Sequence, residues 1–410
     1  MRSYRIFGAM LVIVLVTGIL AACGTVPPQI AATAQSAAGN LAATAQAAAP
    51  TVQAAAGNLA ATAQAAAPTV QAAAGNLAAT AQVVAPTVQA AAATAVSGAT
   101  GTPDKATLQL KWVTQAQFAG YYAALDQGYY KDENLDLTIR PGGPDIAPEQ
   151  VVAGNQAEFG IDWLANLLSV REQGTPLVNI AQVYTNAGMR EISWKESNIN
   201  GPADLKGKKV GIWFFGNEFT LLATLNKYGI DKDKDVTLVQ QPFDMTLLLN
   251  KEVDAAAAMT YNELYQVLSA GHKIEELNII DPNKEGTAMP EDGLFVREDW
   301  IKDAKNKDIA ARFLRASFKG WEYCRDNAAA CVDIMVKNGA PGGAEAQKWQ
   351  MDEVNKLVWG DPINKDTKIG YMDPDVFKRS AETALKFGIT KQLATDATYT
   401  HEIWEMATKK

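Results

Sequence analysis

The chain has 410 residues, and none of the residues from 6 to 103 carries a charged side chain. The folded part is therefore expected to begin near Asp104 and to span about three hundred residues, enough for two lobes. The 37 Lys and Arg residues are outnumbered by 45 Asp and Glu residues, and the net charge of −8 excludes a nucleic-acid binder, which needs a basic face for phosphates.

The first residues have the pattern of a secretory signal. Arg2 and Arg5 precede an apolar run at 6–20, which is short for a membrane span but typical of a signal-peptide core. The run ends in the sequence LAAC, which resembles the bacterial lipobox and ends at Cys23. This pattern predicts a signal peptide at 1–22, lipidation of Cys23 and a protein held by acyl chains on the extracytoplasmic face of the cell membrane. The alternative is a plain signal anchor with a buried cysteine.

Residues 23–103 form an Ala-rich, low-complexity segment with an 18-residue repeat. Gly39, Gly57 and Gly75 recur at this period, but each unit has too few large apolar side chains to build a core. We predict a partly helical tether that holds the body away from the membrane. The alternative is a coiled-coil or partner-binding role, which would make this a surface interaction protein whose stalk is the working part.

From Thr107 onward, short apolar segments alternate with helical patterns, which predicts an α/β fold with largely parallel sheets. Helices are expected at 119–133, up to Arg171 and at 218–228. Strands are expected at 107–113, 135–141, 157–163, 178–185, 190–194, 208–214, 235–241, 253–260, 275–280 and 292–299. The order suggests two α/β lobes with a hinge and a ligand cleft: 104–194 and 295–410 as lobe one, and 195–294 as lobe two.

The C-terminal part is predicted to be mainly helical and contains the other two cysteines. In the helix expected at 307–325, Ile309, Phe313 and Trp321 lie on one stripe. Cys324 and Cys331 are too far apart to bond on one continuous helix, but a break at Asp326-Asn327 would bring them together. An exported protein permits that disulfide, and two buried thiols are the alternative.

Catalytic and metal-binding signatures are lacking in the sequence. The two histidines, His272 and His401, have no Cys or Glu at ligand spacing. Motifs for nucleophilic serines, zinc or phosphate binding do not occur. We therefore expect neither an enzyme nor a bound metal or cofactor. Aromatic and amide residues instead follow the ends of predicted strands, where ligands bind in open α/β sheets.

Three segments carry a resemblance to a known family: "WVTQAQFAGYYAALDQGYYKDENLDL", "DLKGKKVGIW" with "GNEF", and "VDAAAAMTYNE". They are similar to the solute-binding proteins of ABC importers that share a fold with fungal thiamine-pyrimidine synthase and with sulfonate-binding proteins. The resemblance implies a type II periplasmic-binding-protein fold that closes on a small molecule. It also implies a membrane permease as partner, with or without a separate ATPase subunit.

The resemblance also has departures that bear on the ligand. Pyrimidine-binding members have the pattern W-x-x-N-x-x-H-x-G, where this chain has Trp112, Gln115, Phe118 and Gly120. A phenyl ring in place of the imidazole favours a larger, flatter ring system, and riboflavin-binding lipoproteins of the family share the Q-x-Q-F-A-G-Y-Y run. Riboflavin or a related flavin is therefore the predicted ligand, with a thiamine-precursor pyrimidine as the alternative. A synthase activity is disfavoured because the synthase's cysteine-rich iron site and consumed histidine have no counterpart.

The resemblance also places the ligand-binding residues. Trp112, Phe118 and Trp213 would stack on the ring, and Gln115, Asp162, Asn217 and Glu218 would bind its amide edge or a ribityl chain. The full predicted set is Trp112, Gln115, Phe118, Tyr122, Asp162, Trp163, Tyr184, Asn186, Trp213, Asn217, Glu218, Tyr261 and Glu263.

Overall fold

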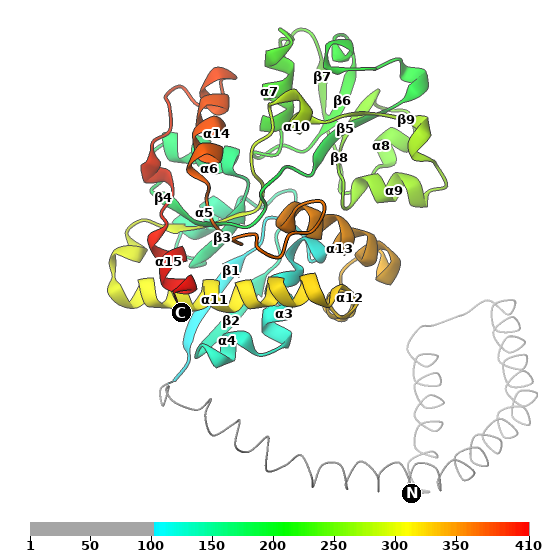
Figure 1. The fold of residues 1–410 in the computed structure, drawn as a ribbon. Helices are drawn as coiled ribbons and strands as arrows, with labels where there is room; N and C mark the ends of the chain where they lie inside the picture. Colours follow the sequence, from blue (N-terminus) through cyan, green and yellow to red (C-terminus); the bar gives the residue numbers. More distant parts are fainter. Residues whose placement is uncertain (1–101, 410) are drawn as a thin grey trace, which may run out of the picture. The chain divides into compact units, whose positions relative to one another are not determined.

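The computed structural model describes residues 102–409. The predicted signal peptide, the lipidation site at Cys23 and the tether up to residue 101 lie outside the described residues. Within the described part the chain builds two five-stranded sheets, each covered by helices (Figure 1). We refer to the sheet that contains the first strand as lobe one and to the other as lobe two.

The sheet of lobe one has the strand order β2-β1-β3-β10-β4. Its strands are β1 (Asp104–Gln109), β2 (Leu135–Arg140), β3 (Phe159–Asp162), β4 (Leu177–Gln182) and β10 (Gly293–Arg297). β1 pairs in parallel with β2 and β3, whereas β10 is antiparallel to β3 and β4. β3 and β4 are buried along their whole length, while β2 alternates buried and exposed residues at first, as expected for an edge strand.

The sheet of lobe two repeats this arrangement with the order β7-β6-β8-β5-β9. Its strands are β5 (Met189–Trp194), β6 (Lys209–Ile212), β7 (Thr237–Gln240), β8 (Ala255–Met259) and β9 (Leu277–Ile280). β6 pairs in parallel with β7 and β8, and β5 is antiparallel to β8 and β9. Each sheet thus contains one antiparallel strand, and that strand enters directly after the chain has crossed from the other lobe.

This sheet membership differs from the predicted lobe boundaries. The sequence analysis ended the first part of lobe one at residue 194, but β5 belongs to the sheet of lobe two. It also ended lobe two at residue 294, but β10 begins at Gly293 in the sheet of lobe one. The reason is that both crossing strands are antiparallel, and the expectation of parallel sheets gave no sign of where the chain changes lobe.

The helices surround the two sheets. Those of lobe one are α3 (Ala119–Asp126), α4 (Tyr129–Asp132), α5 (Pro148–Ala153), α6 (Leu164–Glu172), α11 (Ala304–Asp326), α12 (Ala328–Lys337), α13 (Gly343–Trp359), α14 (Pro374–Lys386) and α15 (Glu402–Thr408). Those of lobe two are α7 (Phe219–Lys227), α8 (Thr246–Leu249), α9 (Glu263–Ser269) and α10 (Pro282–Glu285). Short 3-10 turns lie at η1 (Ala116–Phe118), η2 (Lys195–Ser197), η3 (Pro202–Leu205), η4 (Ile274–Glu276), η5 (Trp300–Lys302) and η6 (Asp396–Thr398).

The helix predicted at 119–133 is broken in two. Gly128 has φ 79°, a left-handed conformation that glycine adopts without strain, and it separates α3 from α4. The turn packs Tyr121 and Tyr130 against Phe313 of α11, with ring centroids 6.5 and 5.8 Å apart. The long helix α11 thus anchors the first helices of lobe one (Figure 1).

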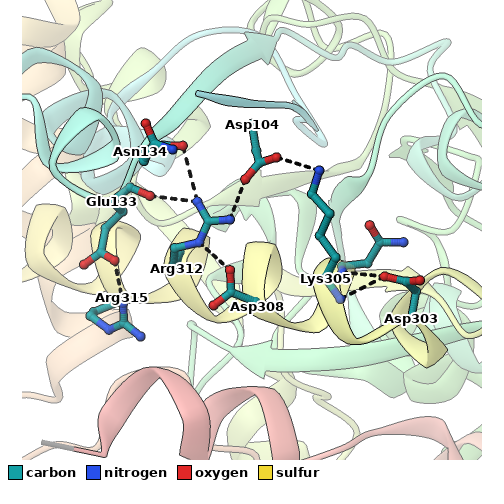
Figure 2. Close-up of polar contacts among 9 residues, drawn as sticks. Asp104, Glu133, Asn134, Asp303, Lys305, Asp308, Arg312 and Arg315 are labelled. Carbon is teal, nitrogen blue, oxygen red and sulfur yellow. Dashed lines mark hydrogen bonds and ion pairs between the residues drawn. The ribbon is translucent and has the colours of Figure 1, made fainter. Parts of the chain in front are cut away.

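One face of α11 fixes the start of β1 through charged contacts (Figure 2). The guanidinium of Arg312 donates to the Asp104 carboxylate at 2.7 Å and to Asp308 at 2.8 Å. It also donates to the backbone oxygens of Glu133 and Asn134. Lys305 adds a second ion pair to Asp104 at 2.9 Å. We call these residues the Arg312 clamp.

Cys324 and Cys331 form a disulfide, which the sequence had left open. α11 ends at Asp326 and α12 begins at Ala328, so the chain turns at Asn327 and brings the two Cα atoms to 5.4 Å. The Asn327 side chain does not cap α12; it donates its amide N–H to the Tyr323 carbonyl in α11.

Candidate ligand-binding site

Ten side chains from both lobes enclose a cavity at the ends of β1, β3, β6 and β8. Lobe one contributes Lys111, Trp112, Gln115, Gln117 and Trp163. Lobe two contributes Trp213, Asn217, Met259, Tyr261 and Glu263. Strand ends from both sheets therefore converge here, as expected for ligand sites in open α/β sheets.

Aromatic rings form the contact between the two lobes at this cavity. The rings of Trp112 and Trp213 meet edge to face, with centroids 5.8 Å apart and an interplanar angle of 66°. Phe243 lies nearly parallel to Trp112 with its centroid at 6.3 Å. The indole N–H of Trp213 donates to the Pro242 carbonyl at 2.9 Å, which fixes the orientation of its ring. Such rings are well suited to stacking on a flat ligand.

The cavity is small in this arrangement. Its volume is about 20 Å³, which is room for about one water molecule. Pockets for drug-sized ligands are on the order of 300 Å³ or larger. A ring system can therefore enter only if the lobes separate or if Trp112 and Trp213 move apart.

A buried ion pair lies on the lobe-one side of the cavity. Lys111 Nζ is 2.7 Å from Asp162 Oδ1, and the two side chains are only 4% and 0% exposed. Asp162 also accepts hydrogen bonds from the Trp163 backbone N–H at 2.7 Å and from Asn166 Nδ2 at 2.8 Å. These contacts compensate for the removal of the carboxylate from water.

Two glutamines connect the cavity to Asp292, at the point where the chain passes from lobe two back to lobe one. Gln115 Nε2 donates to Gln117 Oε1, and Gln117 Nε2 donates to Asp292 Oδ2, each at 2.8 Å. Asp292 lies directly before β10 and has φ 50°, an uncommon value for a residue other than glycine. Burial raises its pKa to about 7.

Two more buried carboxyls stabilise the surrounding backbone. Glu263 accepts from the Met259 N–H at 3.0 Å and from Asn262 Nδ2 at 2.6 Å, and burial raises its pKa to about 7. Glu291, before β10, accepts from the backbone N–H groups of Gly188 and Met189, at the start of β5, and so joins the two segments by which the chain passes between the lobes. Burial raises the pKa of Glu291 to about 8. Both carboxyls thus hold backbone N–H groups close to the cavity.

Seven of the thirteen predicted site residues line the cavity: Trp112, Gln115, Trp163, Trp213, Asn217, Tyr261 and Glu263. Asn217 is held by a hydrogen bond from its amide to the Phe214 carbonyl at 2.8 Å. Asp162 does not line the cavity but lies behind it and holds Lys111. In this structure it contacts the lysine and not the cavity.

Five predicted residues lie elsewhere. Phe118 on η1, Tyr122 on α3 and Tyr184 after β4 are buried in the hydrophobic core and do not line the cavity. Tyr184 donates to the Gln117 carbonyl at 2.9 Å and thus supports the site from behind. Asn186 is exposed and lines a separate groove, and Glu218 is half-buried and accepts from the Gly216 N–H.

Three lining residues were missed: Lys111, Gln117 and Met259. Lys111 directly precedes Trp112, and Gln117 is two residues from Gln115, so a search of every polar residue in the strand-end segment would have found both. Met259 is the last residue of an otherwise all-alanine strand and gives no polar signal.

The family described as NMT1/THI5 like matches residues 115–330, more than half of the chain. The chain belongs to this family. Riboflavin-binding protein RibY of Chloroflexus aurantiacus is 25% identical over 303 residues, which are 71% of this chain and 83% of that protein. A formylaminopyrimidine-binding protein of Halalkalibacterium halodurans is 24% identical over 234 residues, which are 56% of this chain and 69% of that protein.

A solved structure also resembles this member of the NMT1/THI5-like family. The putative periplasmic sulfonate-binding protein of Methylobacillus flagellatus aligns with a TM-score of 0.53 at 16% identity, covering 75% of this chain and 94% of that chain. At this identity the likeness establishes a shared fold. The chain has the two-lobed periplasmic-binding-protein fold that the sequence predicted.

Between residues 102 and 409 there is no helix that is both long and apolar enough to cross a membrane. In the same range, no group of three or more His, Cys, Asp or Glu side chains is placed to hold a metal ion.

Proposed function

We propose that this protein is the extracytoplasmic substrate-binding component of an ABC-type importer. It captures a flat aromatic heterocycle between its two lobes and delivers it to a membrane permease. The observation that carries the proposal is the cavity at the lobe interface, where indoles from both lobes meet beside buried amide and carboxyl groups. Closure of two lobes around a ligand changes the surface of the protein, and a permease can recognise that change.

Riboflavin is the first candidate ligand. Three of the ten lining residues are tryptophans, and stacking on indoles suits a fused ring more than a single small one. The similarity to RibY supports the same choice. Phe118 does not support this choice, because its ring is buried in the core and does not line the cavity.

Riboflavin retention tests the proposal. Protein incubated with riboflavin and then desalted should keep the flavin and quench its fluorescence, because stacked indoles quench flavins. Trp112→Leu and Trp213→Leu should each weaken binding by about 10-fold. Trp404→Leu, on α15 and outside the cavity lining, is the matched control and should bind like the wild type. If neither Trp112→Leu nor Trp213→Leu weakens riboflavin binding, the ligand does not bind at this cavity.

A thiamine-precursor pyrimidine is the second candidate. The small cavity volume of about 20 Å³ favours it, because a single ring requires less opening of the lobes. The buried Glu263 carboxyl, which lines the cavity, can accept from an amino group. A thermal shift with 4-amino-5-hydroxymethyl-2-methylpyrimidine but none with riboflavin would establish this alternative.

The same site gives little support to a synthase-type enzyme. His272 is partly exposed beside Trp194 and pairs with Glu276, and His401 stacks on Tyr371. Neither histidine lines the cavity. Turnover of a pyridoxal-like substrate by the purified protein would overturn the assignment as a binding protein.

The lipid anchor and the tether belong to the same proposal. Cys23→Ser should release the protein from the membrane fraction of the expressing cell. Deletion of residues 30–100 should leave ligand affinity unchanged, because the cavity is built entirely from residues after 110. A loss of affinity on that deletion would favour a working role for the stalk.

A further inference from the structure

Three polar groups on the cavity wall have hydrogen-bonding capacity that residues 102–409 do not use. Gln115 Oε1, the indole Nε1 of Trp163 and Asp292 Oδ1 have no hydrogen-bond partner in this range, although Trp163 lies close enough to Asp292 to lower the pKa of that carboxyl. Lys111 has three N–H donors, and its one polar contact in the described part of the chain is the carboxylate of Asp162.

These three groups are deeply buried. Lys111, Gln115 and Trp163 are only 3%, 1% and 5% exposed, yet all three line the cavity. Buried polar atoms are almost always paired, and leaving them unpaired destabilises the fold. Unpaired atoms that gather on one cavity wall are therefore best explained by a ligand that pairs with them.

The glutamine relay fixes which atom Gln115 presents. Above its pKa of about 7 the Asp292 carboxylate only accepts hydrogen bonds, so Gln117 directs its amide N–H toward it. The Oε1 of Gln117 then accepts from Gln115 Nε2, which leaves the Oε1 of Gln115 free as an acceptor. Asp292 is thus a positioning residue for the cavity.

We infer that the cavity recognises an imide edge, in which two carbonyl oxygens flank one N–H. This inference rests on the proposed binding function and specifies its ligand. Lys111 and Trp163 donate to the two carbonyls, and Gln115 Oε1 accepts from the imide N–H. The wall supplies two donors and one acceptor, and an imide supplies two acceptors and one donor.

An aminopyrimidine fits this wall less well. Its amino group has two N–H donors, and Gln115 Oε1 is the single unpaired acceptor among the three groups. An acceptor for the other donor would have to come from outside the three groups, such as the Glu263 carboxyl, and the cationic ammonium of Lys111 lies on the same cavity wall. A site built for hydrogen bonding rejects analogues that cannot form the bonds.

The test compares riboflavin, 3-methylriboflavin, lumichrome and 4-amino-5-hydroxymethyl-2-methylpyrimidine on the wild-type protein by calorimetry. Methylation at the imide nitrogen removes the donor and leaves the ring otherwise intact. Riboflavin and lumichrome should bind, and 3-methylriboflavin should bind ~10-fold or more weakly than riboflavin. Gln115→Leu should reduce that difference to about 2-fold, because the acceptor it depends on is gone. Gln173→Leu, an exposed glutamine on lobe one, should keep the wild-type difference.

The outcomes separate the inference from the proposed function. Equal binding of riboflavin and 3-methylriboflavin overturns the imide contact. Binding of the aminopyrimidine but of neither riboflavin nor lumichrome overturns it as well, while the binding function stands. Binding of none of the four compounds overturns both. All three outcomes are distinguished by comparing the ligands on the wild-type protein, so the test remains decisive even if Gln115→Leu does not fold.

Discussion

The Arg312 clamp and the wall of the cavity both place charged side chains in lobe one, but they use them differently. Arg312 donates to two carboxylates and two backbone oxygens, so its guanidinium is well paired (Figure 2). Lys111 has one polar partner among the described residues, and the neighbouring Gln115 oxygen and Trp163 N–H have none. The clamp lies at the edge of the fold, whereas the wall is deeply buried.

The difference separates a structural contact from a binding site. A well-paired network near the surface fastens β1 to α11 and leaves few hydrogen-bonding positions for another molecule. Unpaired groups in the buried cavity wall destabilise the ligand-free protein, and a ligand that forms hydrogen bonds with them stabilises the folded state when it binds. The predictions below test this contrast, beginning with the largest effect.

Lys111→Met should strongly destabilise the protein. It leaves the Asp162 carboxylate buried without its cation, and breaking a buried ion pair in this way costs about 3–5 kcal/mol. Denaturation by urea measures the change in the free energy of unfolding. Lys111→Met combined with Asp162→Asn should recover part of the loss, since no unpaired charge then remains.

The matched control for this variant is Lys337→Met. Lys337 is also 2.7 Å from an aspartate, Asp126, but its side chain is 72% exposed. Its loss should change the free energy of unfolding by no more than about 0.5 kcal/mol. Similar effects of Lys111→Met and Lys337→Met would mean that burial does not distinguish the two regions.

Glu263→Gln should weaken the pH dependence of stability. The folded pKa of Glu263 is about 7, above its usual value of 4.5, so the folded state binds more protons than the unfolded state between these values. Stability is therefore lost as the pH rises through this window, by roughly 3 kcal/mol for this group at about 1.4 kcal/mol per pKa unit.

Urea denaturation at pH 5 and pH 8 measures this effect. In the wild type the free energy of unfolding should be lower at pH 8, and in Glu263→Gln the difference between the two pH values should shrink. Glu275→Gln, at an exposed position on η4, is the control. An unchanged difference in Glu263→Gln would show that Glu263 does not retain its proton in the folded protein.

Much of the fold could be predicted from the sequence, because strand and helix periodicity is local. The predicted strands and helices of both sheets occur at nearly their predicted positions, and the stripe of Ile309, Phe313 and Trp321 on α11 is buried. The break at Gly128 and the lobe membership of β5 were not predicted. Both depend on tertiary packing: a helix can continue through a glycine, and an apolar strand can join either sheet.

The candidate site was only partly predictable, for a related reason. The three tryptophans expected at strand ends, Trp112, Trp163 and Trp213, do line the candidate cavity, since the edge of the sheet is where side chains converge. Position along the chain did not give side-chain direction, so Phe118 was expected at the cavity and lies in the core. The ion pair of Lys111 with Asp162 was not predicted, because the two residues are fifty-one positions apart and a single sequence carries no sign of such a pair.

The smallest expected effect is in the Arg312 clamp. A double-mutant cycle of Arg312→Gln and Asp104→Asn should give a coupling energy below about 1 kcal/mol, because the pair is near the surface and is screened by water and salt. The coupling should fall further in 1 M NaCl, whereas the effect of Lys111→Met should change little. The clamp also holds the pKa of Asp104 below its usual value, chiefly through the hydrogen bond from Arg312. Its contribution is therefore present at neutral pH and is lost as the pH falls below about 4. If the coupling is as large as that of Lys111 and Asp162, or does not depend on salt, then the Arg312 clamp and the wall of the cavity do not differ in the way that their burial predicts.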